Sequence, residues 1–333
     1  MKKKILITGA DGFIGSHLVE KLYKLGFSIR ATSLYNSFNS LGWLDTLDNK
    51  ILKKIEIIKC DISDSSIVDT IVKKCDVVIN LAALIGIPYS YSAPESYVKT
   101  NVYGTLNLLS ASRKYKIKKF IHTSTSEIYG NPIYLPIDEK HPAQAFSPYS
   151  ATKISADQLV MSFYRSFNLN ASILRPFNTF GPRQSLRAVI PTIINQVLMG
   201  REEIILGSTN PKRDFSYVDD TINGFINVIK SEKAKGEIIN LGSGYQFSIV
   251  DTVKIISKIM GRRLKIKIDN KRVRPKKSEI FNLLSNNKKA KKLLKWEPIY
   301  CGKRGFESGL IKTVEWYSKE QNLKKFNELD YVV

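Results

Sequence analysis

The segment Lys-Ile-Leu-Ile-Thr-Gly-Ala-Asp-Gly-Phe-Ile-Gly, residues 4–15, decides how the chain folds. An apolar run with strand character, Lys4–Thr8, opens into three glycines at Gly-x-x-Gly-x-x-Gly spacing, and helical periodicity follows over Ser16–Leu25. Glycines permit a tight turn and a close approach of the backbone to a pyrophosphate, which the N–H groups of the helix start attract. We therefore predict that Gly9, Gly12 and Gly15 bind a dinucleotide cofactor.

Strands and helices alternate outward from this turn. The expected strands are Phe27–Leu34, Ile55–Cys60, Val77–Leu81, Phe120–Thr123 and Ala171–Leu174, and the expected long helices are Glu95–Lys114 and Tyr149–Phe167. This alternation predicts an α/β fold with a Rossmann-type doubly wound parallel sheet.

The pattern loosens after Gly181. Helices are expected at Ile190–Met199 and Ile249–Met260, with a strand at Glu237–Leu241. We predict an NAD(P)-binding domain over residues 1–180, joined by a return segment near 219–242. Residues 181–333 form the expected second unit, a smaller mixed α/β substrate-binding domain.

Polar residues follow several of the strands. In NAD-specific sheets an acid often ends the second strand and holds the adenosine ribose. That position lies near Ser33 here, and no acid follows before Asp45. No Arg suited to a 2′-phosphate follows either, so the residues lean towards NAD and leave NADP possible. Asp61 and Asn80 follow later strands, where they either approach the cofactor or cap the next helix.

A second informative stretch carries Tyr149 and Lys153, four residues apart at the start of a helical pattern. That spacing puts both side chains on one helix face. A phenol has a pKa near 10, and a neighbouring ammonium favours its ionised form, so the pair can take a proton from an alcohol. Tyr115 and Lys119 share the spacing, but they stand in a basic run that is most simply a solvated helix end.

Composition and charge argue against several other classes of protein, namely membrane-spanning, metal-binding and nucleic-acid-binding proteins. The 333 residues are 43% hydrophobic and 25% charged, as in soluble globular proteins, and no apolar run is long enough to cross a membrane. The cysteines and histidines show no metal-ligand spacing. A net charge of +22 is compatible with an anionic partner, but the basic stretches lack interleaved aromatic residues, so no nucleic-acid binding is expected. The cytoplasm is the expected location.

Six motifs occur in one order that resembles the extended short-chain dehydrogenase/reductase family of nucleotide-sugar enzymes. They are the glycine turn, Asp61-Ile62, Asn80-Leu81-Ala82-Ala83, the hydroxyl run Thr123–Ser126 with Glu127, Tyr149 with Lys153, and Arg175-Pro176-Phe177-Asn178. The match covers nearly the whole chain. It implies a first domain that binds NAD(P) and a second that closes over a nucleotide-diphosphate sugar.

The resemblance also implies site residues. Cofactor binding is expected for Gly9, Gly12, Phe13, Ile14, Gly15, Ser33, Asn36, Asp61, Ile62, Leu81, Ala82, Ala83, Asn101, Thr123, Tyr149 and Lys153. Substrate binding is expected for Thr125, Asn178, Arg183, Arg213 and Arg274, because Arg grips a diphosphate with paired hydrogen bonds. For Arg213 an ion pair with Asp214 is the structural alternative.

Within the family, Thr125-Ser126-Glu127 resembles the sugar 4,6-dehydratases. The segments Tyr35–Ser40, Gly42–Asp45 and Pro136–His141 are similar to one subgroup, the GDP-N-acetylglucosamine 4,6-dehydratases of bacterial legionaminic acid synthesis. The resemblance implies that Tyr149 takes the C4 hydroxyl proton, Lys153 stabilises the phenolate and Thr125 positions the hydroxyl, while hydride moves from C4 to the cofactor. It also implies that Glu127 removes the C5 proton, that water leaves C6 and that hydride returns to C6. Ser126 departs from relatives with Asp there, so Glu127 or a relayed water must protonate the leaving hydroxyl.

Three alternatives stay open on the sequence. A 4-epimerase shares every motif except the need for Glu127, whereas a UDP-glucuronate decarboxylase needs a cationic pocket that the sequence does not identify. A family member turned into a nucleic-acid-binding or scaffold protein would not need Tyr149 and Lys153. By analogy with the family, a homodimer is expected.

Overall fold

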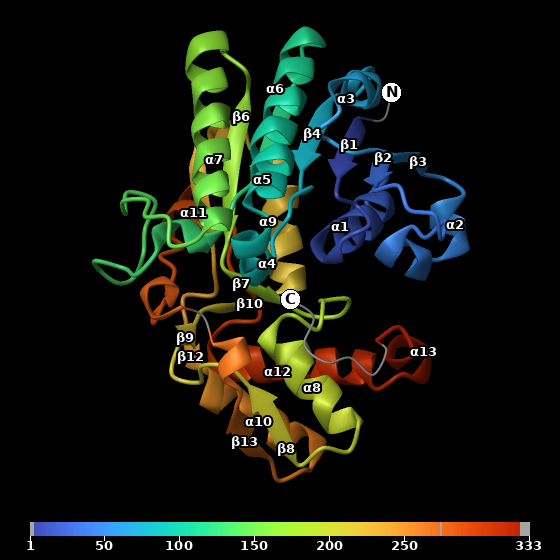
Figure 1. Cartoon of the computed structure of the whole chain (residues 1–333). Helices are drawn as coiled ribbons and strands as arrows, with labels where there is room; N and C mark the ends of the chain where they lie inside the picture. Colours follow the sequence, from blue (N-terminus) through green and yellow to red (C-terminus); the bar gives the residue numbers. More distant parts are fainter. Residues whose placement is uncertain (1–2, 274, 327–333) are drawn as a thin grey trace.

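A seven-stranded parallel sheet forms the centre of the larger lobe, the upper part of the molecule in Figure 1. The structure is a computed structural model that describes residues 3–273 and 275–326. The strands lie in the order β3-β2-β1-β4-β5-β6-β11. They are β1 (Lys4–Thr8), β2 (Ser28–Ser33), β3 (Glu56–Lys59), β4 (Val77–Asn80), β5 (Lys119–Thr123), β6 (Ala171–Pro176) and β11 (Ile238–Leu241). This order is that of a doubly wound Rossmann sheet, so the predicted fold class is confirmed.

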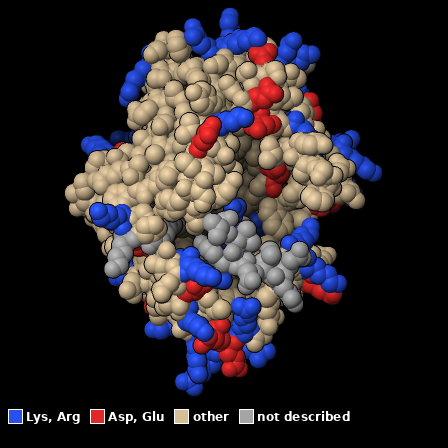
Figure 2. All heavy atoms as spheres, in the orientation of Figure 1, with Lys and Arg blue, Asp and Glu red and all other residues tan. Residues whose placement is uncertain are grey.

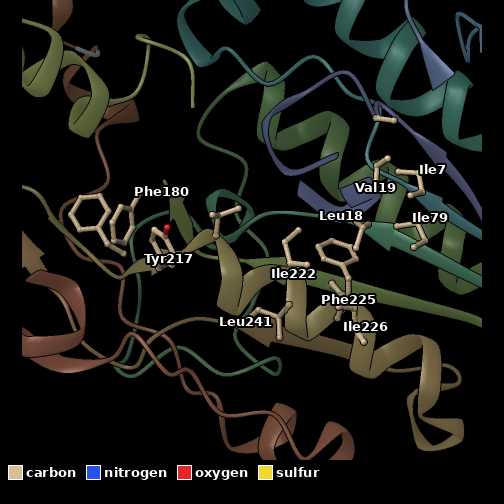
Figure 3. Packing of buried hydrophobic residues seen from close by; sticks show 14 of the residues in the cluster. Ile7, Leu18, Val19, Ile79, Phe180, Tyr217, Ile222, Phe225, Ile226 and Leu241 are labelled. Carbon is tan, nitrogen blue, oxygen red and sulfur yellow. The ribbon is translucent and has the colours of Figure 1, made fainter. Parts of the chain in front are cut away.

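Helices cover both faces of the sheet because side chains alternate along each strand. Ile5 and Ile7 of β1 face a core with helices α1 (Phe13–Lys24) and α9 (Val218–Lys230). Leu6, between them, faces a second core built from α3 (Ser65–Val72), α6 (Gly104–Lys114) and α7 (Pro148–Phe167). Figure 3 shows the first core, with Leu18 of α1 beside Phe225 of α9.

The predicted helix Glu95–Lys114 is interrupted. It begins as α5 (Pro94–Tyr97), widens into a π-helical segment, Val98–Tyr103, and continues as α6. Such widened turns are often found at functional sites. The segment carries Asn101, whose amide holds three groups, the backbone N–H and C=O of Leu84 and the hydroxyl of Thr152.

The smaller lobe lies below the sheet in Figure 1 and is built from short strand pairs and helices. The pairs are β7 (Asn178–Phe180) with β10 (Phe215–Tyr217), β8 (Glu203–Leu206) with β13 (Lys265–Ile268), and β9 (Lys212–Arg213) with β12 (Phe247–Ser248). The helices of eight or more residues are α8 (Val189–Leu198), α10 (Ile249–Met260) and α12 (Gly302–Tyr317). Shorter helices elsewhere in the chain are α2 (Asn49–Leu52), α4 (Ile87–Ser92), α11 (Lys288–Leu294) and α13 (Glu320–Leu323). Between α8 and α10 the chain returns to the large lobe as α9 and β11, and β11 pairs with β6.

An aromatic cluster joins the loop after β2 to the C-terminal helices α12 and α13. Trp43 follows β2, and its ring centroid lies 5.6 Å from those of both Trp316 and Phe326. Trp316 belongs to α12, and Phe326 follows α13. The cluster therefore connects the dinucleotide-binding end of the sheet with the C-terminal helices.

The structure corrects the interpretation of Tyr115 and Lys119 as a solvated helix end. Lys119 begins β5 and is buried, and its ammonium donates to the carbonyls of Val228 and Ser231. Tyr115 donates instead to Asp69 on α3. A basic run in sequence is thus divided between a surface helix end and a buried strand start.

The surface is basic over both lobes. Figure 2 shows Lys and Arg spread across the visible face, with smaller groups of Asp and Glu among them. Among the described residues, no helix is long and apolar enough to span a bilayer. Within the same residues, no group of three or more His, Cys, Asp and Glu is arranged to hold a metal ion, and Cys60, Cys75 and Cys301 are free thiols.

Candidate active site

The glycine turn is shaped by contacts that exclude side chains. Gly9 has φ +64°, and a Cβ there would lie 2.8 Å from the backbone of Ala82. A Cβ on Gly15 would lie 2.2 Å from the carbonyl oxygen of Gly9. Gly12 caps α1 through its backbone, without a side-chain hydrogen bond. The turn therefore offers backbone N–H groups at the start of α1, the arrangement that binds a pyrophosphate.

A cavity of about 1250 Å³ opens beside this turn and extends between the lobes. Typical sites for one small ligand enclose roughly 300–1,000 Å³, so this cavity has room for a cofactor and a substrate together. The predicted site residues that line it are Gly9, Gly12, Phe13, Ile14, Gly15, Leu81, Ala82, Ala83, Thr123, Thr125, Glu127, Tyr149, Lys153, Asn178, Arg183 and Arg213.

Tyr149 enters the cavity from the first turn of α7. Ser147 caps that helix, and it exchanges hydrogen bonds with Ser150. The phenol of Tyr149 is hydrogen-bonded to the hydroxyl of Thr125. Burial raises the pKa of Tyr149 above its ordinary value, and the charge of Glu127 raises it further, whereas the Thr125 hydrogen bond lowers it. Tyr149 is therefore a phenol at neutral pH and needs nearby positive charge to act as a base.

Lys153 lies one turn further along α7. Its ammonium donates to the carbonyl oxygen of Thr123, with Nζ and O 2.6 Å apart. Burial lowers the pKa of Lys153 to about 8, and the carboxylate of Asp157 opposes that fall. Lys153 is thus mostly charged at neutral pH and loses its charge in mildly alkaline solution.

A buried polar network supports the pair from behind, and the sequence did not reveal it. The Asp157 carboxylate accepts from Ser124 at 2.9 Å and forms an ion pair with Arg175 at 2.9 Å. Arg175 also donates to Tyr129, which in turn donates to Asn240 on β11. The four-residue spacing of Lys153 and Asp157 was the available signal, because it places both on one face of α7.

Six predicted residues do not line the cavity, and most are occupied elsewhere. Ser33 accepts from Lys59, Asn36 holds the turn to Ser40, and Asp61 accepts from the N–H of Ser63. Ile62 packs against Gly104, Asn101 holds the segment of Leu84, and Ser126 is buried in the turn after Thr125.

The helix-cap alternative for Asn80 does not hold. Its side chain accepts from Thr8 on β1 at 2.8 Å and donates to Thr105 on α6. Asp64, rather than Asp61, caps α3. Asn80 therefore ties two strands and a helix together beneath the cavity floor.

The arginines expected to bind substrate take different positions. Arg213 is buried beside the cavity, and its ion pair is with Glu279 at 3.3 Å, not with Asp214. Asp214 is occupied by Ser243 and Ser285. Arg183 is anchored to the helix of the glycine turn, where its guanidinium pairs with Glu20 at 3.0 Å. Arg274 lies outside the described residues.

Other cavity-lining residues were not among the predicted site residues, although Asp11 lies inside the glycine motif and Trp43 and Asp45 lie in the segment Gly42–Asp45. Asp11, Trp43 and Asp45 line the end near the glycine turn, and Arg187 and Arg272 line the opposite part. They come from loops far apart in sequence, so only the folded chain brings them to one cavity.

Fold and site together define a dinucleotide-dependent enzyme of the short-chain dehydrogenase type, with Tyr149 and Lys153 facing a cavity built for two ligands. The family model described as GDP-mannose 4,6 dehydratase matches residues 6–309. The chain belongs to this family of nucleotide-sugar dehydratases and epimerases.

Similar proteins include members of both activities. A putative UDP-glucose 4-epimerase from Methanocaldococcus jannaschii is 32% identical, over 94% of this chain and 97% of that protein. A dTDP-D-glucose 4,6-dehydratase from Homo sapiens is 31% identical, over 95% of this chain and 90% of that protein. The crystal structure of UDP-glucuronic acid 4-epimerase from Bacillus cereus, in complex with UDP-glucuronic acid and NAD, has a TM-score of 0.83 and 29% identity, over 94% of this chain and 98% of that chain.

Proposed function

We propose that this chain is an NAD-dependent nucleotide-sugar 4,6-dehydratase that converts GDP-N-acetylglucosamine to its 4-keto-6-deoxy product. One observation carries the choice of dehydration. Glu127 lines the same cavity as Tyr149 and Thr125, close enough for its charge to act on the phenol. A 4-epimerase needs no carboxylate at this place, whereas a dehydratase needs a base for the C5 proton.

The C4 oxidation is assigned to three residues. Thr125 positions the C4 hydroxyl, and Tyr149 removes its proton. Lys153 supplies positive charge one helical turn away, which favours the phenolate that burial otherwise disfavours. NAD supplies the hydride acceptor for C4 and the hydride donor for C6, so it ends the cycle oxidised. The residues proposed to hold it are those of the glycine turn, Leu81–Ala83, Thr123, Tyr149 and Lys153.

Glu127 is assigned both proton transfers of the elimination. The C4 ketone acidifies the C5 proton, which the Glu127 carboxylate removes, and the resulting carboxylic acid protonates the departing C6 hydroxyl, which leaves as water. Once hydride has returned to C6, C5 takes a proton from solvent, which completes the 4-keto-6-deoxy product. Ser126 is a poor acid, and it is buried without lining the cavity. The assignment of the second transfer to Glu127 therefore removes the need for an acid at position 126.

The proposed sugar, N-acetylglucosamine, and the proposed nucleotide, GDP, both rest on the subgroup resemblance. Of its segments, Tyr35–Ser40 and Gly42–Asp45 contribute Ser40, Trp43 and Asp45 to the cavity. Pro136–His141 contributes no residue to the cavity lining, and its Glu139 accepts from the backbone N–H of Asn240 at 2.8 Å. Asn178, Arg183, Arg213 and Arg274 are the proposed substrate residues, the first three of which line the cavity.

Incubation with GDP-N-acetylglucosamine in D₂O tests the proposal. We expect mass spectrometry to find a product lighter by one water that has gained deuterium at C5, with no net reduced cofactor. Glu127→Gln should stop water loss while leaving the thermal unfolding temperature unchanged. Accumulation of a C4 epimer of unchanged mass would instead establish epimerisation. Parallel assays with UDP- and dTDP-sugars would show whether the enzyme prefers a nucleotide other than GDP.

We also propose a homodimer formed through the outer surface of α6 and α7. Tyr103, before α6, is 58% exposed, and Phe167, at the end of α7, is 44% exposed. The guanidinium of Arg113 stacks on Phe167 at 3.8 Å. Light scattering should give twice the monomer mass, and Tyr103→Glu should reduce it. A monomeric wild-type protein would reject this assembly.

A further inference from the structure

The end of β2 lacks the acid that usually holds an adenosine ribose. β2 ends at Ser33, and the next residue is Leu34. The hydroxyl of Ser33 accepts from Lys59, and the side chain of Ser33 does not line the cavity. If the chain uses NAD, as proposed above, another residue must bind the hydroxyls of the adenosine ribose.

Asp11 brings a carboxylate to that place from the neighbouring strand. It stands inside the glycine turn after β1, which pairs in parallel with β2. Its Oδ2 accepts from the backbone N–H of Leu34 at 3.0 Å. Asp11 also lines the cavity. A carboxylate therefore sits at the end of β2, although no acid occurs there in the sequence.

The loop after β2 fixes Asp11 in position. The carbonyl oxygen of Asp11 accepts from the N–H of Trp43 at 2.9 Å. Gly42 has φ +60°, and a Cβ there would lie 2.7 Å from that same oxygen. Asp45 lines the cavity beside Trp43, and its carboxylate accepts from the hydroxyl of Ser40 and the N–H of Leu41. The cavity wall near β2 thus presents two carboxylates.

Two lysines, Lys59 and Lys325, lie near this part of the cavity, and they are placed differently from the carboxylates. The ammonium of Lys59 donates to the carbonyl oxygen of Ser40 at 2.6 Å, and Lys59 does not line the cavity. Lys325 does line it, but its ammonium lies 6.0 Å from the ring of Trp43 and its side chain is exposed. Near the end of β2, Asp11, Asp45 and the exposed Lys325 line the cavity, whereas Lys59 does not, although its ammonium lies 3.3 Å from the hydroxyl of Ser33. A 2′-phosphate in this part of the cavity would therefore face two carboxylates and one exposed ammonium.

We propose that Asp11 replaces the missing acid, holding the hydroxyls of the adenosine ribose and making the chain select NAD over NADP. A carboxylate accepts hydrogen bonds from both ribose hydroxyls, and it repels the charge of a 2′-phosphate. The inference depends on the proposed use of a nicotinamide dinucleotide, but not on which sugar reacts.

Titration calorimetry with NAD and with NADP, at one ionic strength and without sugar, tests this selectivity. Asp11→Asn keeps a side-chain oxygen for the N–H of Leu34 but loses the charge, and Asp11→Ser also shortens the side chain. We expect the wild type to bind NAD at least about tenfold more tightly than NADP, and both variants to lose most of that ratio. Asp48→Asn is the matched control, because Asp48 is exposed, caps α2 and does not line the cavity.

Each outcome is decisive. A ratio that falls in both Asp11 variants and stays unchanged in Asp48→Asn supports the inference. A ratio unchanged in the Asp11 variants, or a wild type that prefers NADP, overturns it. Because binding is measured without turnover, a protein that selects NAD through Asp11 yet fails to dehydrate the sugar would reject only the proposed reaction.

Discussion

At the scale of single residues, burial sets the charge of the catalytic pair. Lys153 has a pKa of about 8, so its ammonium is lost as the pH rises through that value. Because the phenolate of Tyr149 needs that charge, activity should fall in the same range. Asp157 is the neighbour that opposes the fall in the pKa of Lys153, and it does not itself line the cavity.

Asp157→Asn should therefore move the alkaline limb of the kcat/KM profile to lower pH, by up to about one unit. Asn can still accept from Ser124, so the side-chain position is largely kept, although Arg175 loses its charge partner. The measurement is kcat/KM between pH 6 and 10. Asp69→Asn, at an exposed ion pair with Lys114, is the control. An alkaline limb at the wild-type pH would show that Asp157 does not act through Lys153.

His17 gives a prediction about stability in acid. Burial, with the charge of Arg183 adding to it, lowers the pKa of His17 from 6.5 to about 4. Between these values the unfolded chain binds the proton and the folded chain does not, so stability is present above pH 6.5 and is lost towards pH 4. The loss from this residue is on the order of 3 kcal/mol at most.

His17→Gln should reduce the difference in unfolding free energy between pH 7 and pH 4.5, measured with urea. Gln can keep the contact with the carbonyl oxygen of Pro182, which His17 makes at 2.9 Å, but it does not titrate. Lys21→Gln, on the same helix, should leave the pH difference as in the wild type. An equal acid loss in His17→Gln would place the sensitivity on other groups.

At the scale of elements, the sequence predicted features set by spacing within one element, but it could not predict contacts between elements that are distant in the sequence. The turn of Gly9–Gly15 and the helix carrying Tyr149 and Lys153 were predictable, because spacing within one element fixes their faces. The ion pair of Asp157 with Arg175 joins α7 to β6, and no periodicity reports it. Likewise, Asp11 meets Leu34 only because β1 and β2 are neighbours.

The role of the π-helical segment in stability and in NAD binding can be tested by a substitution at Asn101. Asn101 bonds both backbone groups of Leu84 and the hydroxyl of Thr152, joining the loop after β4 to α7. Asn101→Ala leaves these groups unpaired in a buried place, which should cost about 2–4 kcal/mol of unfolding free energy. Since Ala82 and Ala83 line the cavity just before Leu84, NAD affinity should fall as well.

Urea unfolding and calorimetric NAD binding measure the two effects of Asn101→Ala. Lys99→Ala, an exposed position in the same segment, should change neither. Loss of stability with unchanged NAD affinity would mean that the widened turn supports the fold without shaping the cofactor cavity.

At the scale of the whole molecule, the cavity exists because the chain passes between its lobes more than once. After α8 it returns as α9 and β11, so β11 borders the sheet through β6 while α10 and α12 follow in the smaller lobe. The sequence indicated the return segment near 219–242, but it could not indicate that Trp316 and Phe326 reach back to Trp43. The sequence alone does not show which aromatic side chains pack against one another, because that depends on the fold.

That aromatic cluster makes a prediction about how the lobes cooperate. In α12, the ring of Trp316 lies 4.9 Å from Tyr317, 5.6 Å from Trp43 and 6.3 Å from Phe326. Trp316→Ala removes these ring contacts, and because Trp316 is only partly buried we expect about 2–3 kcal/mol of lost stability. Trp43 lines the cavity beside Asp45, so NAD should also bind more weakly and raise the unfolding temperature less than in the wild type. Tyr35→Ala, at a position that is 75% exposed in the same loop, is the control. If Trp316→Ala lowered stability but left the NAD-induced rise in unfolding temperature intact, the cluster would pack the C-terminal helices without influencing the cofactor site.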